Sequence, residues 1–245
     1  DRTAKFFIDG KQARPDGGTA RPVLGAKGTV LGEVGEGNRK DVRNAVEAAR
    51  GAASWGGKSQ HNRAQILYYM GENLSARAAE FAERLSAQTG IKADKARAEV
   101  AASVSRLFTY GAWADKVEGT VHMPPMKGLA LAVPEPIGVA GVICPEESPL
   151  LGFLSTVAPL IATGNRVVAI ASEAHPLSAT DFYQVLETSD LPGGVLNILT
   201  GSAQTLGREL AKHNDVDVLW AFTTPELSAE VERLSIGNLK RVFTD

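Results

Sequence analysis

The sequence has little cysteine or histidine and no long apolar run, and each shortage excludes a class of protein. Of 245 residues, one is cysteine (Cys144) and four are histidine, and no two histidines have metal-ligand spacing. A single cysteine excludes an internal disulfide and a cysteine-rich metal site, and it fits a reducing, cytoplasmic compartment. No apolar run reaches the roughly 20 residues that span a bilayer, and no signal-peptide pattern opens the chain. We therefore expect neither a metal nor a membrane partner.

An excess of charge of one sign is also lacking. The formal net charge is −2, and acidic and basic residues are interleaved, so nucleic acid is not an expected partner. With 44% hydrophobic and 22% charged residues, the chain can build one large domain or two small ones. It does not begin with Met and it stops on the strand-like run RVFTD. We therefore expect a piece of a longer polypeptide.

The first half of the chain combines short strands with helical segments. KFFIDGKQ predicts two β runs around an Asp-Gly turn. Apolar residues at helical spacing predict helices, with Asn38 or Asp41 as the first N-cap and Gly90 as a C-cap. The expected helices cover residues 41–55, 62–90 and about 93–117. A loose alternation around Lys127-Gly128 then predicts a β-hairpin interrupted by proline.

The second half alternates short apolar runs with helical segments. The expected strands cover residues 138–144, 165–171, 193–199, 216–222 and 239–243. Continuous apolar strands that alternate with helices indicate a parallel sheet covered on both faces, and right-handed crossovers make it a Rossmann-like, doubly wound α/β fold. The division expected is 1–118 for N-terminal strands and helices, 119–137 for the hairpin, and 138–245 for the Rossmann-like part.

A ligand site of such a fold lies outside the carboxyl ends of the strands, where Cys144, Pro145, Glu146 and Glu147 fall. No Gly-x-Gly-x-x-Gly fingerprint follows the first strand, so that motif does not support dinucleotide binding. The two glutamates could be an acid/base pair or the exposed residues of a turn. Neighbouring residues point apart and no nucleophile lies nearby, so we favour the turn. Cys144 ends an apolar strand and is interpreted as a small buried hydrophobe.

Many segments of the chain, in their order, resemble landmarks of the aldehyde dehydrogenase superfamily. They are FFIDGKQ, NRAQIL, QTGIK, YGAWADKVEG, PEPIGVAGVICP, PLLGFLSTVAPLIATGNRVV, SEAHPLSA, DLPGGVLNILTG, HNDVDVLWAFTT and NLKRV. The resemblance implies an NAD(P)-binding Rossmann domain, a catalytic domain that follows it, and a flap hairpin used in oligomer contacts. In this chain the flap corresponds to about residues 119 to 136.

The departures from the family pattern fall on functional positions. Active relatives read Pro-Trp-Asn-Phe-Pro where this chain has Pro145-Glu146-Glu147-Ser148-Pro149. Glu147 therefore replaces the Asn whose amide stabilises the oxyanion, and the loss of one such donor costs ~10²- to 10³-fold in rate. An ionised carboxylate offers no donor and repels the developing charge.

Further departures fall on the cofactor positions that the resemblance implies. Ile170, Ala171, Ser172 and Glu173 stand where relatives have Lys-Pro-Ser-Glu, so Ile170 replaces the Lys that binds the cofactor ribose, while Glu173 keeps its place. Thr223 replaces the Gly that approaches the pyrophosphate. Thr224 keeps a hydroxyl that can cap a helix or donate to a phosphate.

The catalytic residues of the family are changed or missing. Asp245 stands in the place of the general-base Glu, one methylene shorter, and the nucleophilic cysteine belongs to the part of the family sequence beyond it. Cys144 cannot substitute, because no His or Lys nearby in sequence lowers its pKa. The degraded cofactor-binding set implied is Pro145, Ile170, Ser172, Glu173, Thr223 and Thr224.

Two hypotheses follow from this pattern. The chain most resembles the C-terminal pseudo-aldehyde-dehydrogenase region of family-16 aldehyde dehydrogenases, which implies a non-catalytic domain with no cofactor expected bound. Its partners would be an aldehyde dehydrogenase catalytic domain and, through the flap, a second copy of the chain. The alternative is the excised NAD-binding portion of an active NAD(P)-dependent enzyme that oxidises aldehydes to acids. The simultaneous losses at Glu147, Ile170 and Thr223 favour the first hypothesis.

Overall fold

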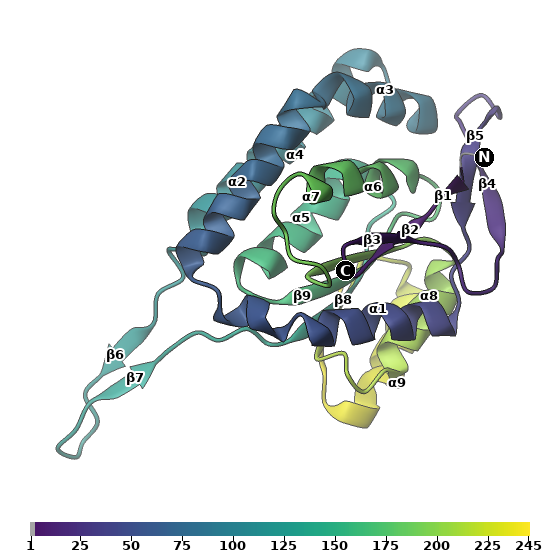
Figure 1. The fold of residues 1–245 in the computed structure, drawn as a ribbon. Helices are drawn as coiled ribbons and strands as arrows, with labels where there is room; N and C mark the ends of the chain where they lie inside the picture. Colours follow the sequence, from purple (N-terminus) through teal and green to yellow (C-terminus); the bar gives the residue numbers. More distant parts are fainter. Residues whose placement is uncertain (1–2) are drawn as a thin grey trace.

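The computed structural model describes residues 3–245, and its centre is a seven-stranded sheet (Figure 1). The strand order is β12-β11-β8-β9-β10-β2-β3. The strands are β2 (Phe6–Ile8), β3 (Lys11–Ala13), β8 (Val139–Ile143), β9 (Arg166–Ile170), β10 (Leu196–Leu199), β11 (Val218–Ala221) and β12 (Arg241–Thr244). Strands β8 to β12 are mutually parallel, and β2 and β3 add antiparallel pairs at one end. The predicted doubly wound α/β fold is confirmed.

Helices cover both faces of this sheet because successive side chains of each strand point to opposite sides. In β9, Val167 and Ala169 join one apolar cluster, whereas Val168 and Ile170 join the other. The second cluster packs against α1 (Arg39–Gly51), α8 (Ala203–Lys212) and α9 (Pro225–Leu234). The first packs against α2 (Gln60–Ala76), α3 (Ala78–Thr89), α4 (Ala93–Ala114), α5 (Pro149–Ala162), α6 (Leu177–Asp181) and α7 (Tyr183–Glu187). The 3-10 turns η1 (Ala53–Gly57) and η2 (Ser235–Asn238) complete the helical elements described.

The expected helix over residues 62–90 is wrong as a single element. It is divided at Arg77 into α2 and α3. The division lets Arg77 donate a 2.8 Å hydrogen bond to Gln184, while Phe81 lies edge-on against the ring of Phe182. The helical segment expected between the second and third strands is likewise divided at Phe182, whose ring is fully buried between Phe81 and Phe153. Packing of aromatic rings between distant segments therefore overrides the local helical pattern.

The expected caps agree with the structure. Asn38 is the N-cap of α1, and Asp41 completes a capping box by accepting from the Asn38 backbone N–H. Gly90 ends α3 in the left-handed region, with φ of 75°. The Asp9–Gly10 turn joins β2 to β3, and both of its residues have positive φ. The division into residues 1–118, 119–137 and 138–245 stays a prediction, and β2 and β3 of its first part extend the sheet of its third.

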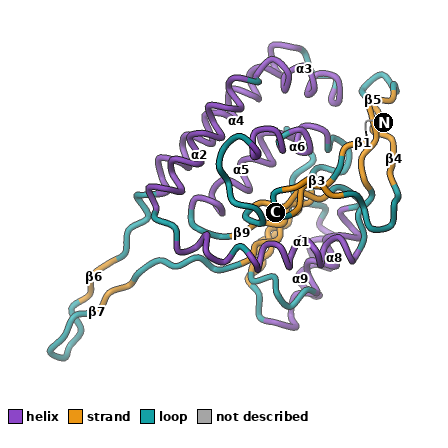
Figure 2. The backbone as a smooth tube through the Cα atoms, viewed as in Figure 1, coloured by secondary structure: helices purple, strands orange, loops and turns teal. Residues whose placement is uncertain are grey.

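Two smaller sheets lie outside the main one. Strands β6 (Thr120–His122) and β7 (Ala130–Ala132) pair antiparallel as the expected hairpin, which projects far from the rest of the chain (Figures 1 and 2). Strands β1 (Thr3–Ala4), β5 (Val30–Gly35) and β4 (Ala20–Leu24) form a three-stranded sheet that the sequence did not predict. Among residues 3–245, no helix is long and apolar enough to cross a bilayer.

Candidate functional site

The strand order changes direction beside β8, and this position defines where a ligand can enter. The chain runs from β8 to β9 and β10 on one side, and then crosses to β11 and β12 on the other side. In open α/β sheets, ligands bind in the crevice outside the carboxyl ends of the strands at such a switch point. The residues that follow β8, β9 and β11 are therefore the first candidates for a site.

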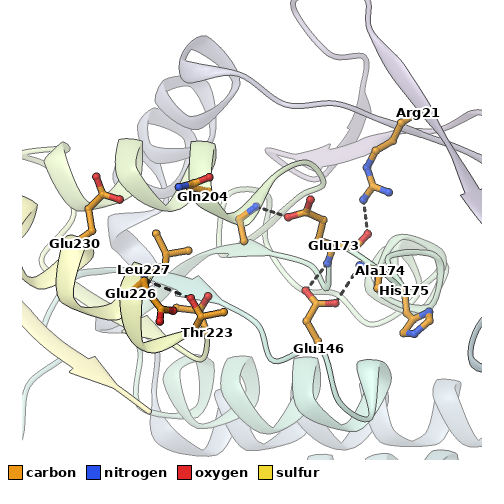
Figure 3. Close-up of a pocket in the computed structure, with 12 residues that line it drawn as sticks. Arg21, Glu146, Glu173, Ala174, His175, Gln204, Thr223, Glu226, Leu227 and Glu230 are labelled. Atoms are coloured by element: carbon orange, nitrogen blue, oxygen red, sulfur yellow. Dashed lines mark hydrogen bonds between the residues drawn. The ribbon is translucent and has the colours of Figure 1, made fainter.

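A pocket of about 800 Å³ opens at this edge between α8 and α9, and we call it the α8–α9 pocket (Figure 3). Its lining residues are Arg21, Glu146, Glu173, Ala174, His175, Ala203, Gln204, Thr223, Thr224, Glu226, Leu227 and Glu230. They come from the segments that follow β8, β9 and β11, from the first turn of α8, from the first two turns of α9, and from β4. The pocket thus combines a few apolar side chains of two helices with polar groups from the same helices and from three strand ends.

Glu146 makes hydrogen bonds that the sequence did not predict. Its carboxylate accepts three hydrogen bonds, from Ser172 Oγ at 2.6 Å, Glu173 N at 2.7 Å and Ala174 N at 3.0 Å. These donors form the turn after β9, and Ser172 Oγ in turn accepts from His175 N. Glu146 and Glu147 are both exposed, as expected for a turn, and Glu146 in addition links the ends of two neighbouring strands.

Glu173 connects the same turn to α8. Its Oε2 accepts from Ala203 N at 2.9 Å, at the first residue of the helix, where an anion is favoured. Its backbone carbonyl accepts from Arg21. The Arg21 guanidinium also forms a 3.0 Å ion pair with Glu36, so the cation of the pocket wall is already neutralised by a carboxylate.

Thr223 faces these glutamates from the other side of the crevice, after β11 (Figure 3), and Thr224 lines the same pocket. Thr224 is the N-cap of α9, and its hydroxyl accepts from Leu227 N at 3.4 Å. Pro225 occupies the first helical position, as expected from its fixed φ. The structure therefore brings Glu173, Thr223 and Thr224 together around one pocket, while Ser172 is buried beside it and hydrogen-bonded to Glu146.

Four of the predicted site residues lie elsewhere. Ile170 is fully buried in the cluster beneath α1 and α8 and does not line the pocket. Glu147 lines a separate cavity of about 660 Å³ between α4 and α5, which shares only Glu146 and His175 with the α8–α9 pocket. Asp245 extends the pairing of β12 through a hydrogen bond from its N–H to Ala221 O. Pro145 is half-buried and packs beside Gly152 of α5.

Cys144 is not a nucleophile in this environment. It is 2% exposed, and its Sγ lies 3.9 Å from Thr156 Oγ. Burial raises the pKa of the Cys144 thiol to about 12, with a small opposite effect of the Thr156 hydrogen bond and a contribution from the Glu146 charge. The interpretation of Cys144 as a buried hydrophobe agrees with this geometry. Groups of three or more His, Cys, Asp or Glu that could bind a metal are absent from residues 3–245.

The sequence missed the residues that α8, α9 and β4 contribute, among them Gln204, Glu226 and Arg21. Gln204 and Glu226 lie in the first turns of helices that follow strands, a position that could have marked them. Arg21 comes from a small sheet that has no apolar pattern of its own, and the sequence carried no signal for it.

A doubly wound sheet with a pocket at its switch point defines this chain as an α/β domain of the nucleotide-binding type. Residues 14–244 match the aldehyde dehydrogenase family, and the chain belongs to that family. It is 30% identical over 242 residues to a betaine aldehyde dehydrogenase of Bacillus subtilis, covering 97% of this chain and 49% of the relative. It is 34% identical over 224 residues to a mitochondrial aldehyde dehydrogenase, family 2 member B4, of Arabidopsis thaliana, covering 89% and 41%.

A solved structure shows the same correspondence. The NAD-dependent aldehyde dehydrogenase of Sinorhizobium meliloti superposes with a TM-score of 0.95 at 25% identity, covering all of this chain and 50% of that one. The chain thus spans about half the length of the curated relatives it matches. It corresponds to the NAD-binding half of the family fold.

Proposed function

We propose that this chain forms the nucleotide-binding half of an NAD(P)-dependent aldehyde dehydrogenase, and that the α8–α9 pocket holds the nucleoside end of the cofactor. The whole enzyme would oxidise aldehydes to acids. The observation that carries the proposal is the position of the pocket, which lies at the switch point of a sheet shared with NAD-dependent relatives.

The residues of the pocket fit a nucleoside. Ala203 and Leu227 offer apolar surface on two facing helices, which suits a flat base. Glu173 uses one carboxylate oxygen on Ala203 N, and its other oxygen can accept from a ribose hydroxyl. The residues fit a pyrophosphate less well, because the wall carries four glutamates and its arginine is paired. The proposal therefore concerns the uncharged end of the cofactor.

The test is thermal unfolding with adenosine and with NAD. A ligand that binds only the folded state stabilises it by about 2.7 kcal/mol at 100 times its Kd. We expect a saturable rise in Tm with adenosine, and its loss in Ala203→Phe, which fills the pocket. The matched control is Ala79→Phe on an exposed face of α3, which should keep the response. A wild-type Tm that neither ligand changes at millimolar concentration would refute the proposal.

A second function, a non-catalytic assembly domain, is favoured by the hairpin. Its apolar side chains are between 61% and 81% exposed, and they are Val121, Met123, Met126, Leu129, Leu131 and Val133. An isolated two-stranded hairpin is marginally stable, so such a surface gains stability from a partner. The partner proposed is a second copy of the chain or an attached aldehyde dehydrogenase catalytic domain, bound by strand addition.

The cytoplasm is the proposed location of the chain. A reduced, buried Cys144 and the lack of a membrane-spanning helix within residues 3–245 agree with that compartment.

A further inference from the structure

The carboxylate of Glu146 occupies a set of donors that would otherwise be open to an anionic group. Ser172 Oγ, Glu173 N and Ala174 N converge on its two oxygens at 2.6 to 3.0 Å. Two backbone N–H groups and a hydroxyl on one turn are the kind of donors that hold a phosphate or a carboxylate. The chain thus supplies its own anion to this turn.

The position of Glu146 makes this contact relevant to ligands. Glu146 comes three residues after the end of β8, at the switch point, and it lines the α8–α9 pocket opposite Thr223 (Figure 3). A ligand that extends from the pocket toward β8 passes this carboxylate. The side chain therefore sets the charge at the entrance to the crevice.

Neighbouring amide donors of the same edge are occupied in the same way. Glu99 accepts from Leu150 N at 3.0 Å and from Leu151 N at 3.3 Å, at the start of α5. Glu173 accepts from Ala203 N at the start of α8. Because carboxylates of the chain already satisfy these donors, an incoming phosphate meets negative charge where it would need hydrogen-bond donors.

We propose that Glu146 tunes the ligand preference of the α8–α9 pocket: as an internal anion on the turn after β9, it weakens the binding of NAD relative to an uncharged nucleoside by repelling the cofactor phosphates, and it leaves the place of the nucleoside end free. This inference rests on the proposed nucleoside site. Glu146 thus selects among ligands by their charge. Removal of that charge should tighten binding of phosphorylated ligands and leave adenosine unaffected.

The first experiment compares adenosine and NAD by isothermal titration calorimetry on the wild-type chain and on Glu146→Gln. We expect NAD to bind about tenfold or more tightly to the variant, because the repulsion between like charges is removed, while the Kd for adenosine changes less than twofold. Glu72→Gln on an exposed face of α2 makes the same change of net charge and should leave both affinities unchanged. If the ratio of the two affinities is the same in wild type and Glu146→Gln, the specificity role is wrong, although the nucleoside site stands.

The second experiment uses Glu146→Ala and inorganic phosphate, and it does not depend on nucleotide binding. Truncation frees the three donors, so phosphate should raise the Tm of Glu146→Ala saturably and leave wild type and Glu72→Gln unchanged. Circular dichroism at low temperature confirms that each variant is folded. If folded Glu146→Ala shows no response to phosphate, the turn is not an anion-holding group and the inference fails. A response to phosphate without any binding of adenosine would instead refute the nucleoside site alone.

Discussion

The central parallel strands and the β6–β7 hairpin use similar apolar residues in opposite surroundings. Every residue of β8 and β9 is buried, whereas every residue of β6 and β7 is exposed. The sheet obtains its stability from helices on both faces, and the hairpin contacts little besides itself (Figure 1). Apolar composition alone therefore does not tell a core from an interaction surface. The difference lies in whether the chain supplies the covering elements.

The largest loss of stability is expected from a substitution in the apolar core that covers the central sheet. Phe153 of α5 is fully buried, and its ring lies edge-on to Phe182 with centroids 5.8 Å apart. Phe153→Ala should lower the free energy of unfolding by about 3–5 kcal/mol through lost burial and the cavity that remains. Urea unfolding followed by circular dichroism measures the change. The corresponding truncation Leu129→Ala in the hairpin, where the side chain is 61% exposed, should cost less than about 0.5 kcal/mol. Similar costs at the two positions would abolish the distinction between the regions.

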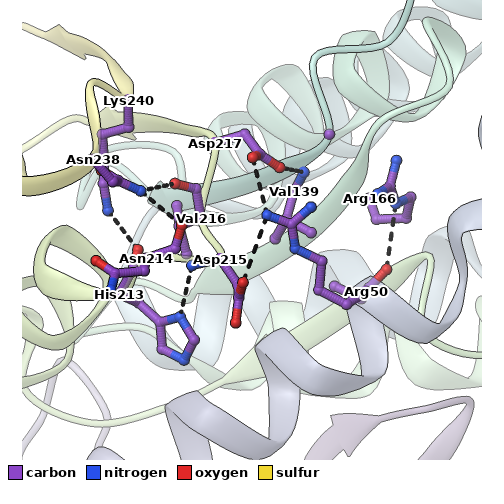
Figure 4. A network of polar contacts seen from close by, with 12 residues as sticks. Arg50, Val139, Arg166, His213, Asn214, Asp215, Val216, Asp217, Asn238 and Lys240 are labelled. Carbon is purple, nitrogen blue, oxygen red and sulfur yellow. Dashed lines mark hydrogen bonds and ion pairs between the residues drawn. The ribbon is translucent and has the colours of Figure 1, made fainter.

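A smaller effect, on how stability depends on pH, is expected on the β11–β12 side of the sheet, around Asp217 (Figure 4). Lys240 donates to Leu210 O and His213 O, and burial lowers its pKa to about 8, partly opposed by the charge of Asp217. The unfolded chain keeps this proton up to about pH 10.5. Between these pH values the unfolded state binds more protons than the folded state, so this group makes stability rise with pH from about 8 to 10.5.

The variant Lys240→Met tests the contribution of Lys240 to this pH dependence. That contribution is the difference between the pH profiles of wild type and variant. Tm measured from pH 7 to 11 should show a shallower rise, or a steeper fall, with pH in Lys240→Met than in wild type. Lys127→Met, at the exposed tip of the hairpin, should reproduce the wild-type profile. Parallel profiles for wild type and Lys240→Met would show that the proton affinity of Lys240 does not change on folding.

Much of the contrast between the central strands and the hairpin could be predicted from the sequence. The predictions that failed have a common cause. Continuous apolar runs identified the four inner parallel strands, since strands buried on both faces show no alternation. The run LKRVF also identified the edge strand β12, although its residues are exposed or half-buried. The division of the helix at Arg77 and the contacts of Glu146 depend on residues far along the chain. Glu146 meets donors 26 to 28 residues away. Local patterns record which side chains are apolar or charged, but they do not record which turn a charged side chain will reach.

The smallest effect on stability is expected in the hairpin, where the proposed role is association. Val121 and Leu131 are directly paired across the two strands, and 66% and 62% of these side chains are exposed. The double variant Val121→Ser/Leu131→Ser should change the free energy of unfolding of the monomer by no more than about 0.5 kcal/mol. It should nevertheless weaken self-association, because the apolar surface is what a partner strand would cover. Sedimentation equilibrium measures the association constant.

The matched control is an equally exposed apolar pair in the other projecting hairpin. Leu24 and Val30 are paired between β4 and β5, with 53% and 64% of these side chains exposed. Leu24→Ser/Val30→Ser removes similar apolar area from a sheet whose inner face already packs within the chain, through Val23 and Val34. Association should therefore survive this change. If both double variants weaken association equally, exposed apolar area in general drives it. If neither variant does so, the hairpin is not an interface between copies of the chain.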